Sequence, residues 1–283
     1  RKEYLFFDEK FGLRSRRIVS AYPKKWKSLV WHAFNNRPGA SDQNAQMRMT
    51  ELIQNLWQNS VKRPGTFPEL NIWLERAEAE HEARPFHAII ATTNPRCRPF
   101  VIDATELIKM GHELWTVPYT YPTPRNAEEI ARTLLPIVKI ARHVALVDPY
   151  FDPAKRRFRS TLAAMLAACE ECFCGIDQLI VELHTSIDRH FKSWERGEFR
   201  NLAEEYEYYA KFVKDCQNLL PELLPSGIEL KIFVWKQQDN GEKLHNRYLL
   251  TNVLGVMFGV GSDESDNLES AEECQVCGEI LIS

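Results

Sequence analysis

Residues 243–252, KLHNRYLLTN, together with residues 259–264, GVGSDE, decide how this chain is interpreted. In the first stretch His245 stands two residues before the cation Arg247, and the carboxamide of Asn252 follows five residues later. If the arginine begins a strand, it projects from the same face as the histidine, because side chains alternate along a strand. A guanidinium holds phosphate oxygens, and an imidazole attacks phosphorus or transfers a proton. The pair therefore predicts a phosphate site.

The spacing resembles the motif of the phospholipase D superfamily, His-x-Lys-x4-Asp with a Gly-Ser turn behind it. Here the pattern is His245-x-Arg247-x4-Asn252, with Gly261-Ser262-x-Glu264 behind it. Arginine replaces the lysine, so the cation is kept, whereas asparagine replaces the aspartate and its negative charge is lost. In this resemblance the glutamate orients the histidine and favours its protonated form. The implied catalytic residues are His245, Arg247, Asn252 and Glu264.

A closer resemblance covers residues 140–265. Residues 147–150 (VDPY) end one apolar run, residues 183–188 (LHTSID) end a second, and the two motifs follow in order. This part is similar to the phospholipase D-like domain at the C-terminus of the eukaryotic microtubule-interacting-and-trafficking domain protein. Bacterial and phage-defence proteins carry similar modules. The eukaryotic relative is thought to bind phospholipid rather than cleave it.

The composition of the chain is that of a soluble globular protein. It has 283 residues, 44% hydrophobic and 27% charged, with no apolar run near the roughly 18 residues that span a membrane. The seven cysteines are an odd number without a disulfide-like pattern, which favours the cytoplasm. Pairs such as Cys169-x-x-Cys172 lie at helical spacing and read as buried thiols, so no metal or other cofactor is expected. Because the sequence begins Arg-Lys-Glu, we expect a trimmed N-terminus.

Charge is spread unevenly along the chain. Residues 1–39 hold ten Lys or Arg against three acids, and residues 262–283 hold seven acids and no Lys or Arg. A basic segment suits nucleic acid or an anionic lipid, although it could equally be a solvated surface that pairs with the acidic tail.

The pattern predicts two parts: a mixed, mainly helical region over 1–115 and an α/β domain over 116–283. In the first part, residues 41–58 and 67–83 have helical apolar spacing, and residues 87–92 read as a strand. The proline-rich segment 116–125 is the best candidate for the connection. Alternatively, strand 87–92 belongs to the second part's sheet, and the boundary falls near residue 85.

From residue 126 the pattern is α/β. Asn126 and Glu129 resemble a capping box that begins a helix. Alternation of predicted strands and helices implies a mixed sheet flanked by helices, as in phospholipase D-like proteins. The further predicted helices are 153–172 and much of 191–223. The predicted strands are 144–147, 178–183, 228–234, 248–250 and 256–259.

Residues distant in sequence should meet where the strands of such a sheet end. Blander interpretations exist for each candidate. Arg247 could pair with Asp148 or Glu264 in the core, Asn252 could make a hairpin turn, and His184 could be a polar strand end. The expected substrate contacts are Asp148, Tyr150, His184 and Ser262.

Phospholipase D chemistry uses two histidines, and this chain has one complete motif. The resemblance therefore implies a homodimer in which His245 of one copy forms the phosphohistidine and its symmetry mate is the acid. The first hypothesis is a metal-independent nuclease, for which the resemblance implies a role in bacterial anti-phage defence and other subunits of such a system as partners. The second is an inactive module that binds nucleic acid or anionic phospholipid. The third is a protein-interaction domain.

Overall fold

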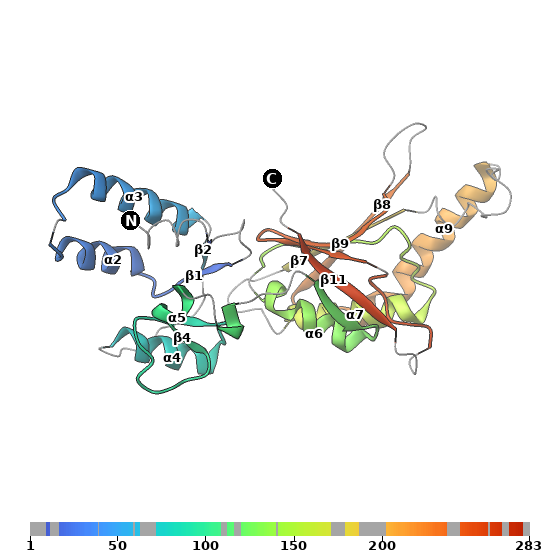
Figure 1. The fold of residues 1–283 in the computed structure, drawn as a ribbon. Helices are drawn as coiled ribbons and strands as arrows, with labels where there is room; N and C mark the ends of the chain where they lie inside the picture. The colour runs from blue at the N-terminus through green and yellow to red at the C-terminus, as the bar shows by residue number, and fades with distance from the viewer. Residues whose placement is uncertain are drawn as a thin grey trace. The chain divides into compact units, whose positions relative to one another are not determined.

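Figure 1 shows the computed structural model of the chain. It describes residues 10–11, 17–38, 40–58, 60–62, 72–108, 112–115, 120–139, 141–170, 179–186, 202–236, 244–259, 261–267 and 272–279. The chain divides into two compact units, Arg1–Pro118 and Tyr119–Ser283. Among the helices described, none has the length and hydropathy that crossing a membrane requires.

The first unit combines helices with two small parallel sheets. β1 (Val19–Ala21) pairs with β2 (Ser60–Lys62), and β3 (Ile89–Ala91) pairs with β4 (Val101–Asp103). Because β3 pairs with β4, the predicted strand 87–92 lies outside the sheet of the second unit. The helical elements are α2 (Trp26–Asn35), α3 (Gln43–Gln58), α4 (Trp73–Ala83), α5 (Ala104–Ile108) and the 3-10 turn η2 (Glu113–Trp115).

The second unit is built on a mixed seven-stranded sheet with the order β5-β11-β10-β9-β6-β7-β8. β6, β7 and β8 run parallel, whereas β9 is antiparallel to β6 and every remaining pair is antiparallel. The strands are β5 (Thr120–Pro124), β6 (Val144–Val147), β7 (Leu179–Ser186), β8 (Ile228–Trp235), β9 (Arg247–Thr251), β10 (Gly255–Phe258) and β11 (Glu273–Glu279).

Alternation along the strands divides the sheet into two faces. In β7 the side chains of Leu179, Val181 and Leu183 are buried, whereas Glu182 and His184 between them are partly exposed. β8 repeats this pattern with a more exposed outer face. A strand with one apolar face and one polar face must pack its apolar face against another layer.

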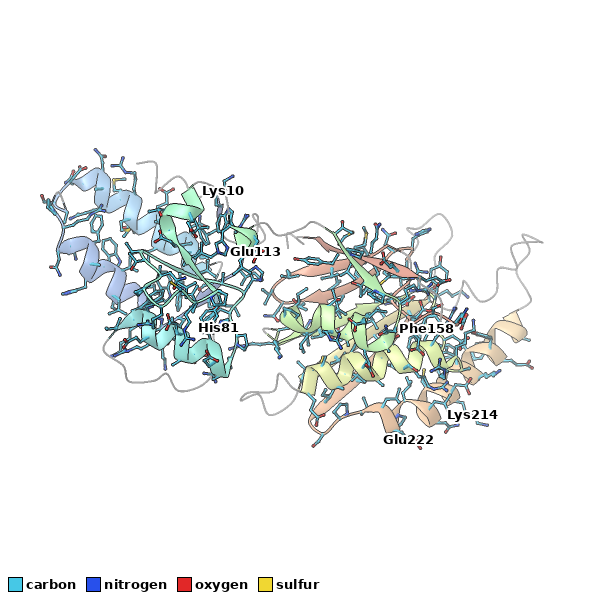
Figure 2. All side chains as sticks on the ribbon, turned by 60° about the horizontal axis from the view of Figure 1, so that its bottom comes forward. Lys10, His81, Glu113, Phe158, Lys214 and Glu222 are labelled. Carbon is cyan, nitrogen blue, oxygen red and sulfur yellow. The ribbon has the colours of Figure 1, made fainter. Side chains whose placement is uncertain are left out.

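That layer consists of α6 (Ala127–Val138), α7 (Arg156–Glu170) and α9 (Leu202–Leu219), followed by the 3-10 turn η3 (Pro221–Leu223). In Figure 1 α6 and α7 lie below the sheet, and in Figure 2 they lie in front of it, with Phe158 at the start of α7. The helices share one apolar core with the sheet, including Ile130, Leu134, Phe158, Leu162, Leu166, Phe212, Leu183, Leu249 and Val256. We call the opposite side the open face, because no helix of the described residues contributes to a core there.

The start of α6 confirms the predicted cap. The Asn126 side chain accepts a hydrogen bond of 2.8 Å from the amide of Glu129, which satisfies one donor of the first turn. The Glu129 carboxylate, however, pairs with Arg132 on the helix surface and does not complete a capping box.

The segment predicted as a connection, 116–125, contains the boundary between the two units, and its residues Thr120–Pro124 form a strand of the second unit's sheet. β5 contains Pro122 and Pro124 and lies at one end of the strand order. Proline has no N–H to donate to a neighbouring strand, so within sheets it is confined to edge positions. The proline cluster thus correctly predicted an extended backbone, but it did not predict that this segment joins the sheet.

Candidate functional site

The candidate site lies at the edge of the sheet where β6 ends and β9 begins. In their antiparallel pairing Val147 is opposite Tyr248, so Asp148 follows β6 beside Arg247 at the start of β9. Ser262 and Asp263 reach the same edge from the segment after β10. The topology therefore brings together three segments that are distant in sequence.

Asp148 is the buried centre of this cluster, with a relative exposure of 1%. One carboxylate oxygen, Oδ1, accepts a 2.9 Å hydrogen bond from the amide of Tyr150 and lies 3.7 Å from Nε of Arg247. The other, Oδ2, accepts a hydrogen bond from the hydroxyl of Ser262. Burial raises the pKa of Asp148, while the hydrogen bonds from Ser262 and Tyr150 and the charge of Arg247 oppose that rise.

Arg247 is held by packing as well as by charge. Its guanidinium carbon lies 4.3 Å from the ring centroid of Tyr150, a cation–π distance. Its Nε is buried and has no hydrogen-bond partner among the described residues, because 3.7 Å to Asp148 is an ion-pair distance and too long for a hydrogen bond. The side chain is 23% exposed, so the guanidinium keeps donor capacity for a ligand.

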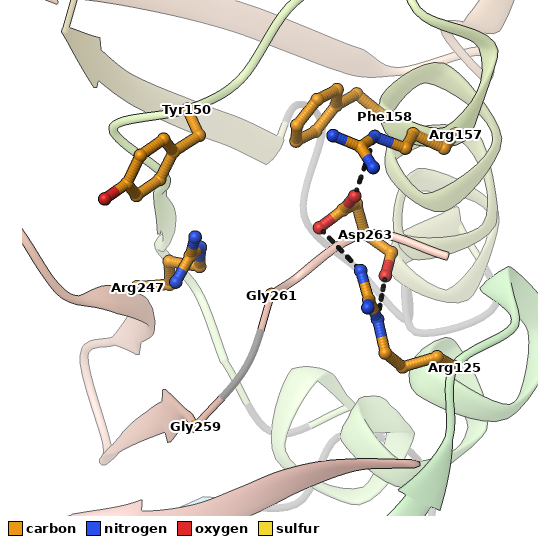
Figure 3. Close-up of a pocket in the computed structure, with 8 residues that line it drawn as sticks. All are labelled: Arg125, Tyr150, Arg157, Phe158, Arg247, Gly259, Gly261 and Asp263. Carbon is orange, nitrogen blue, oxygen red and sulfur yellow. Dashed lines mark hydrogen bonds and ion pairs between the residues drawn. The ribbon is translucent and has the colours of Figure 1, made fainter. Parts of the chain in front are cut away.

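Arg247 lines a pocket of about 370 Å³ that we call the arginine pocket. Two further arginines line it: Arg125 from the segment between β5 and α6, and Arg157 from the first turn of α7. Figure 3 shows Arg247 and Tyr150 on one side, and Arg157, Asp263 and Arg125 on the other. The remaining lining residues are Phe158, Gly259 and Gly261.

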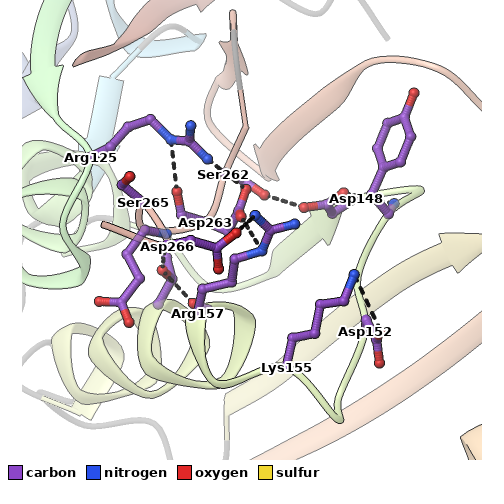
Figure 4. A network of polar contacts seen from close by, with 12 residues as sticks. Arg125, Asp148, Asp152, Lys155, Arg157, Ser262, Asp263, Ser265 and Asp266 are labelled. Carbon is purple, nitrogen blue, oxygen red and sulfur yellow. Dashed lines mark hydrogen bonds and ion pairs between the residues drawn. The ribbon is translucent and has the colours of Figure 1, made fainter. Parts of the chain in front are cut away.

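Asp263 joins two of the three arginines. Its carboxylate lies 3.5 Å from Nη2 of Arg125 and 3.1 Å from Nε of Arg157, and its side chain is only 6% exposed. Each arginine has a second carboxylate partner, Glu272 at 3.0 Å for Arg125 and Asp266 at 2.7 Å for Arg157. Figure 4 shows how this network continues through Ser262 to Asp148.

Gly261 lets the chain pass this close to the network. Its φ is +116°, a conformation that side chains rarely adopt, and an added Cβ would lie 2.6 Å from Oδ1 of Asp263. The same Cβ would lie 3.0 Å from Nη2 of Arg125. Glycine is therefore needed at this position for two reasons: its backbone adopts a positive φ, and a Cβ would collide with Asp263.

Two predicted site residues lie away from the cluster. The carboxylate of Glu264 is 3.1 Å from Nη1 of Arg156, so it forms an ion pair with α7. Asn252 lies in the β9–β10 hairpin, where its side-chain oxygen accepts hydrogen bonds of 2.7 and 3.2 Å from the amides of Arg142 and His143. At about 3.4 Å per residue, the five residues from Arg247 to Asn252 place this turn about 17 Å from Arg247.

His184 lies on the open face. Its Nε2 is 3.0 Å from Glu182, and its Nδ1 accepts a 3.0 Å hydrogen bond from the indole of Trp235. Its backbone carbonyl accepts from the amide of Asp148, so the residue adjoins the cluster while its side chain lies on the other face.

His245 is exposed and does not line the arginine pocket. Its Nδ1 lies 3.2 Å from the side-chain oxygen of Asn246, and β9 begins only at Arg247. The structure thus brings together Asp148, Tyr150, Arg247 and Ser262 of the predicted residues. The roles of all eight predicted residues stay predictions.

Sequence reasoning gave no site role to Arg125, Arg157 or Asp263. The basic start of the predicted helix, KRR at residues 155–157, was a usable signal, because cations directly after a strand end lie at the edge where ligands bind. Arg125 carried no comparable signal in its proline-rich segment. No group of three or more His, Cys, Asp or Glu side chains suited to a metal occurs among the described residues.

Comparisons with protein-family models, with curated proteins and with solved structures found no match to this chain.

Proposed function

We propose that the second unit is a phospholipase D-like module that binds a phosphodiester group in the arginine pocket. The observation that carries the proposal is the convergence of Arg125, Arg157 and Arg247 on one cavity of about 370 Å³. Guanidinium groups bind phosphate oxygens through paired N–H donors, and ligand pockets of a few hundred Å³ are typical. The resemblance around His245 and Gly261-Ser262 supports the family assignment.

The exposure of two acids beside the pocket leaves room for an anionic ligand. The three arginines contact two buried carboxylates, Asp148 and Asp263, and two exposed ones, Glu272 and Asp266, whose contacts with arginine an anion can displace. Asp148 lies 3.7 Å from Nε of Arg247, too far for a hydrogen bond, so that donor is not used by the carboxylate. The α7 helix begins next to the pocket, and the positive end of its dipole adds to the attraction.

A second candidate is phosphodiester cleavage through His245. The observation that favours it is the exposure of this imidazole two residues before the pocket arginine, which leaves it accessible to a second copy of the chain. His245 would attack phosphorus, forming an N–P bond as the P–O bond breaks, and the partner copy's histidine would protonate the leaving oxygen. Water would then cleave the N–P bond. An anti-phage setting rests on the resemblance alone.

The test is to incubate the purified chain, with EDTA present, with labelled single- and double-stranded DNA and RNA, and in parallel with phosphoinositide vesicles. Arg247→Met should lower binding to every phosphodiester, while Arg132→Met, which removes a 67% exposed arginine outside the pocket, should not. Equal binding by both variants and the wild type would refute the arginine pocket as the binding site.

His245→Ala separates the two candidates. Cleavage that is independent of metal and lost in this variant, from a chain that sediments as a dimer, would establish the phosphohistidine enzyme. Binding that is equal in both proteins without cleavage would leave the binding module.

A further inference from the structure

Strand register places a row of side chains straight across the open face. His184 is opposite Phe233 on β8 and Val147 on β6, and Val147 is opposite Tyr248 on β9. Trp235 lies two residues beyond Phe233 on the same side of β8. The β7–β8 end of this row is therefore made of rings, three of them within two neighbouring strands.

These three rings form an ordered surface, which we call the aromatic platform: His184, Phe233 and Trp235. The imidazole stacks on Phe233 with ring centroids 4.7 Å apart and an interplanar angle of 9°. The indole lies 5.9 Å from the imidazole at 14°, and its N–H donates to Nδ1 of His184 at 3.0 Å. The planes of the imidazole and the indole are thus nearly parallel, and a hydrogen bond joins the two rings.

The platform is exposed and already rigid. Trp235 is 52% exposed and Phe233 is 38% exposed. Because Nδ1 of His184 accepts from the indole, the proton of the neutral ring is on Nε2, 3.0 Å from the Glu182 carboxylate. Rings held in this way lose little conformational freedom when a ligand stacks on them.

The arginine pocket lies on the helix-covered side of the sheet edge, and the platform lies on the open face. β9, which begins with Arg247, is three strands from β8 in the sheet order, so the two are about 14 Å apart when measured along the sheet. This lateral distance corresponds to about four stacked nucleotides, and a strand needs further nucleotides to pass around the edge. A flexible chain crossing the sheet edge beside His245 could place phosphates in the pocket and flat rings on the platform.

We propose that the aromatic platform stacks the bases of single-stranded nucleic acid whose phosphates occupy the arginine pocket, an inference that rests on the proposed function. Aromatic side chains beside cationic groups bind single strands with little sequence preference, because every base has a π-face. A duplex hides its base faces, and an acyl chain has no flat ring to stack. Single strands are therefore the phosphodiester that uses both surfaces.

The test measures fluorescence anisotropy of a labelled oligothymidylate and of an abasic deoxyribose-phosphate strand of equal length. Trp235→Ala should weaken oligothymidylate binding about tenfold and leave the abasic strand unchanged. Trp235→Phe, which keeps a ring, should retain most of the binding. Arg247→Met should weaken both strands, and Tyr206→Ala, which removes a 78% exposed aromatic ring on α9, should weaken neither.

The outcomes separate the two proposals. Equal binding of the two strands, unaffected by Trp235→Ala, overturns the platform and leaves the phosphate site standing. Absence of binding by either strand overturns both. If Trp235→Ala instead abolishes binding to phosphatidylserine vesicles while oligothymidylate binds no better than the abasic strand, the rings contact a membrane and the proposal is wrong.

Discussion

Replacing Asp263 by asparagine gives opposite predictions for stability and for ligand binding. The substitution keeps the shape of the side chain and removes the charge that lies between Arg125 and Arg157. If these arginines form an anion site, Asp263 is a stabilising partner in the unliganded protein and a competitor of the ligand. The variant should therefore be less stable and bind phosphodiesters more tightly.

The magnitude follows from burial and from the remaining partners. Breaking a fully buried ion pair costs about 3–5 kcal/mol. Here Asp263 is 6% exposed, but its partners are 14% and 26% exposed and each keeps a second carboxylate at 3.0 or 2.7 Å. We therefore expect a loss of about 2 kcal/mol, which lowers the urea midpoint by about 1 M. Removing one negative charge next to the bound phosphate should raise affinity about tenfold.

The assay is urea unfolding followed by circular dichroism, together with anisotropy titration of a labelled oligonucleotide. Asp266→Asn is the matched control, because Asp266 contacts the same Arg157 but is 80% exposed, and it should change stability by less than about 1 kcal/mol. If Asp263→Asn leaves both the urea midpoint and the affinity at the control's values, the proposed competition between Asp263 and the ligand is refuted.

Three further predictions concern the same network. Arg247→Met should weaken phosphodiester binding about tenfold or more, and Arg247→Lys should weaken it less, because an ammonium keeps the positive charge but lacks the paired N–H donors of a guanidinium. Isothermal titration calorimetry measures both affinities. An equal loss in the two variants would show that the positive charge by itself does not support binding. Burial raises the pKa of Asp148, so the folded protein binds more protons than the unfolded chain between the ordinary and raised values; stability should fall as pH rises through that window, and Asp148→Asn should lack this slope in urea titrations at several pH values. Gly261→Ala combines an unfavourable φ with a Cβ that would lie 2.6 Å from Asp263, and it should lower stability by about 3 kcal/mol. Gly227→Ala is the control, because Gly227 has φ +80° but nothing lies within 4 Å of the added Cβ, and it should lower stability by about 1 kcal/mol. Similar melting temperatures of the two variants would contradict the steric argument.

The sheet of the second unit could be predicted where its strands have a clear periodicity. The buried run 144–147 and the alternating run 228–234 both form strands, β6 and β8. β11 was not predicted, because the sequence of Glu273–Glu279 is polar and acidic and has no clear strand periodicity. Its pairing with β10 on one side and β5 on the other identifies it as a strand. In the first unit, β1, β2 and β4 are three-residue strands, too short for any period to appear.

The site could be predicted in part for a related reason. Asp148 was predicted because polar residues at strand ends converge in any sheet of this kind, and Ser262 was predicted from the Gly-Ser turn of the resemblance. The position of Arg157 in the pocket depends on how α7 is rotated about its axis. The position of Arg125 depends on the proline-containing edge strand β5 joining the sheet. Neither geometry is encoded in local spacing. The expectation that Glu264 orients His245 did not allow for Arg156, which lies 3.1 Å from that carboxylate.

The two departures from the phospholipase D motif have different consequences once their positions are known. Asn252 accepts hydrogen bonds from two backbone N–H groups in a hairpin about 17 Å from Arg247. This role needs only a side-chain oxygen, so asparagine and aspartate fill it equally well. Its lost charge is therefore no argument against a working site. Arg247 keeps the cation and adds a fork that can hold two phosphate oxygens at once. The feature that supports the binding proposal over cleavage is instead the environment of His245: its contact among the described residues is the carboxamide of Asn246, while the carboxylate of Glu264 pairs with Arg156. In the cleavage proposal the histidine of a second copy supplies the acid, so the loss of cleavage in His245→Ala and the sedimentation of the chain as a dimer must occur together.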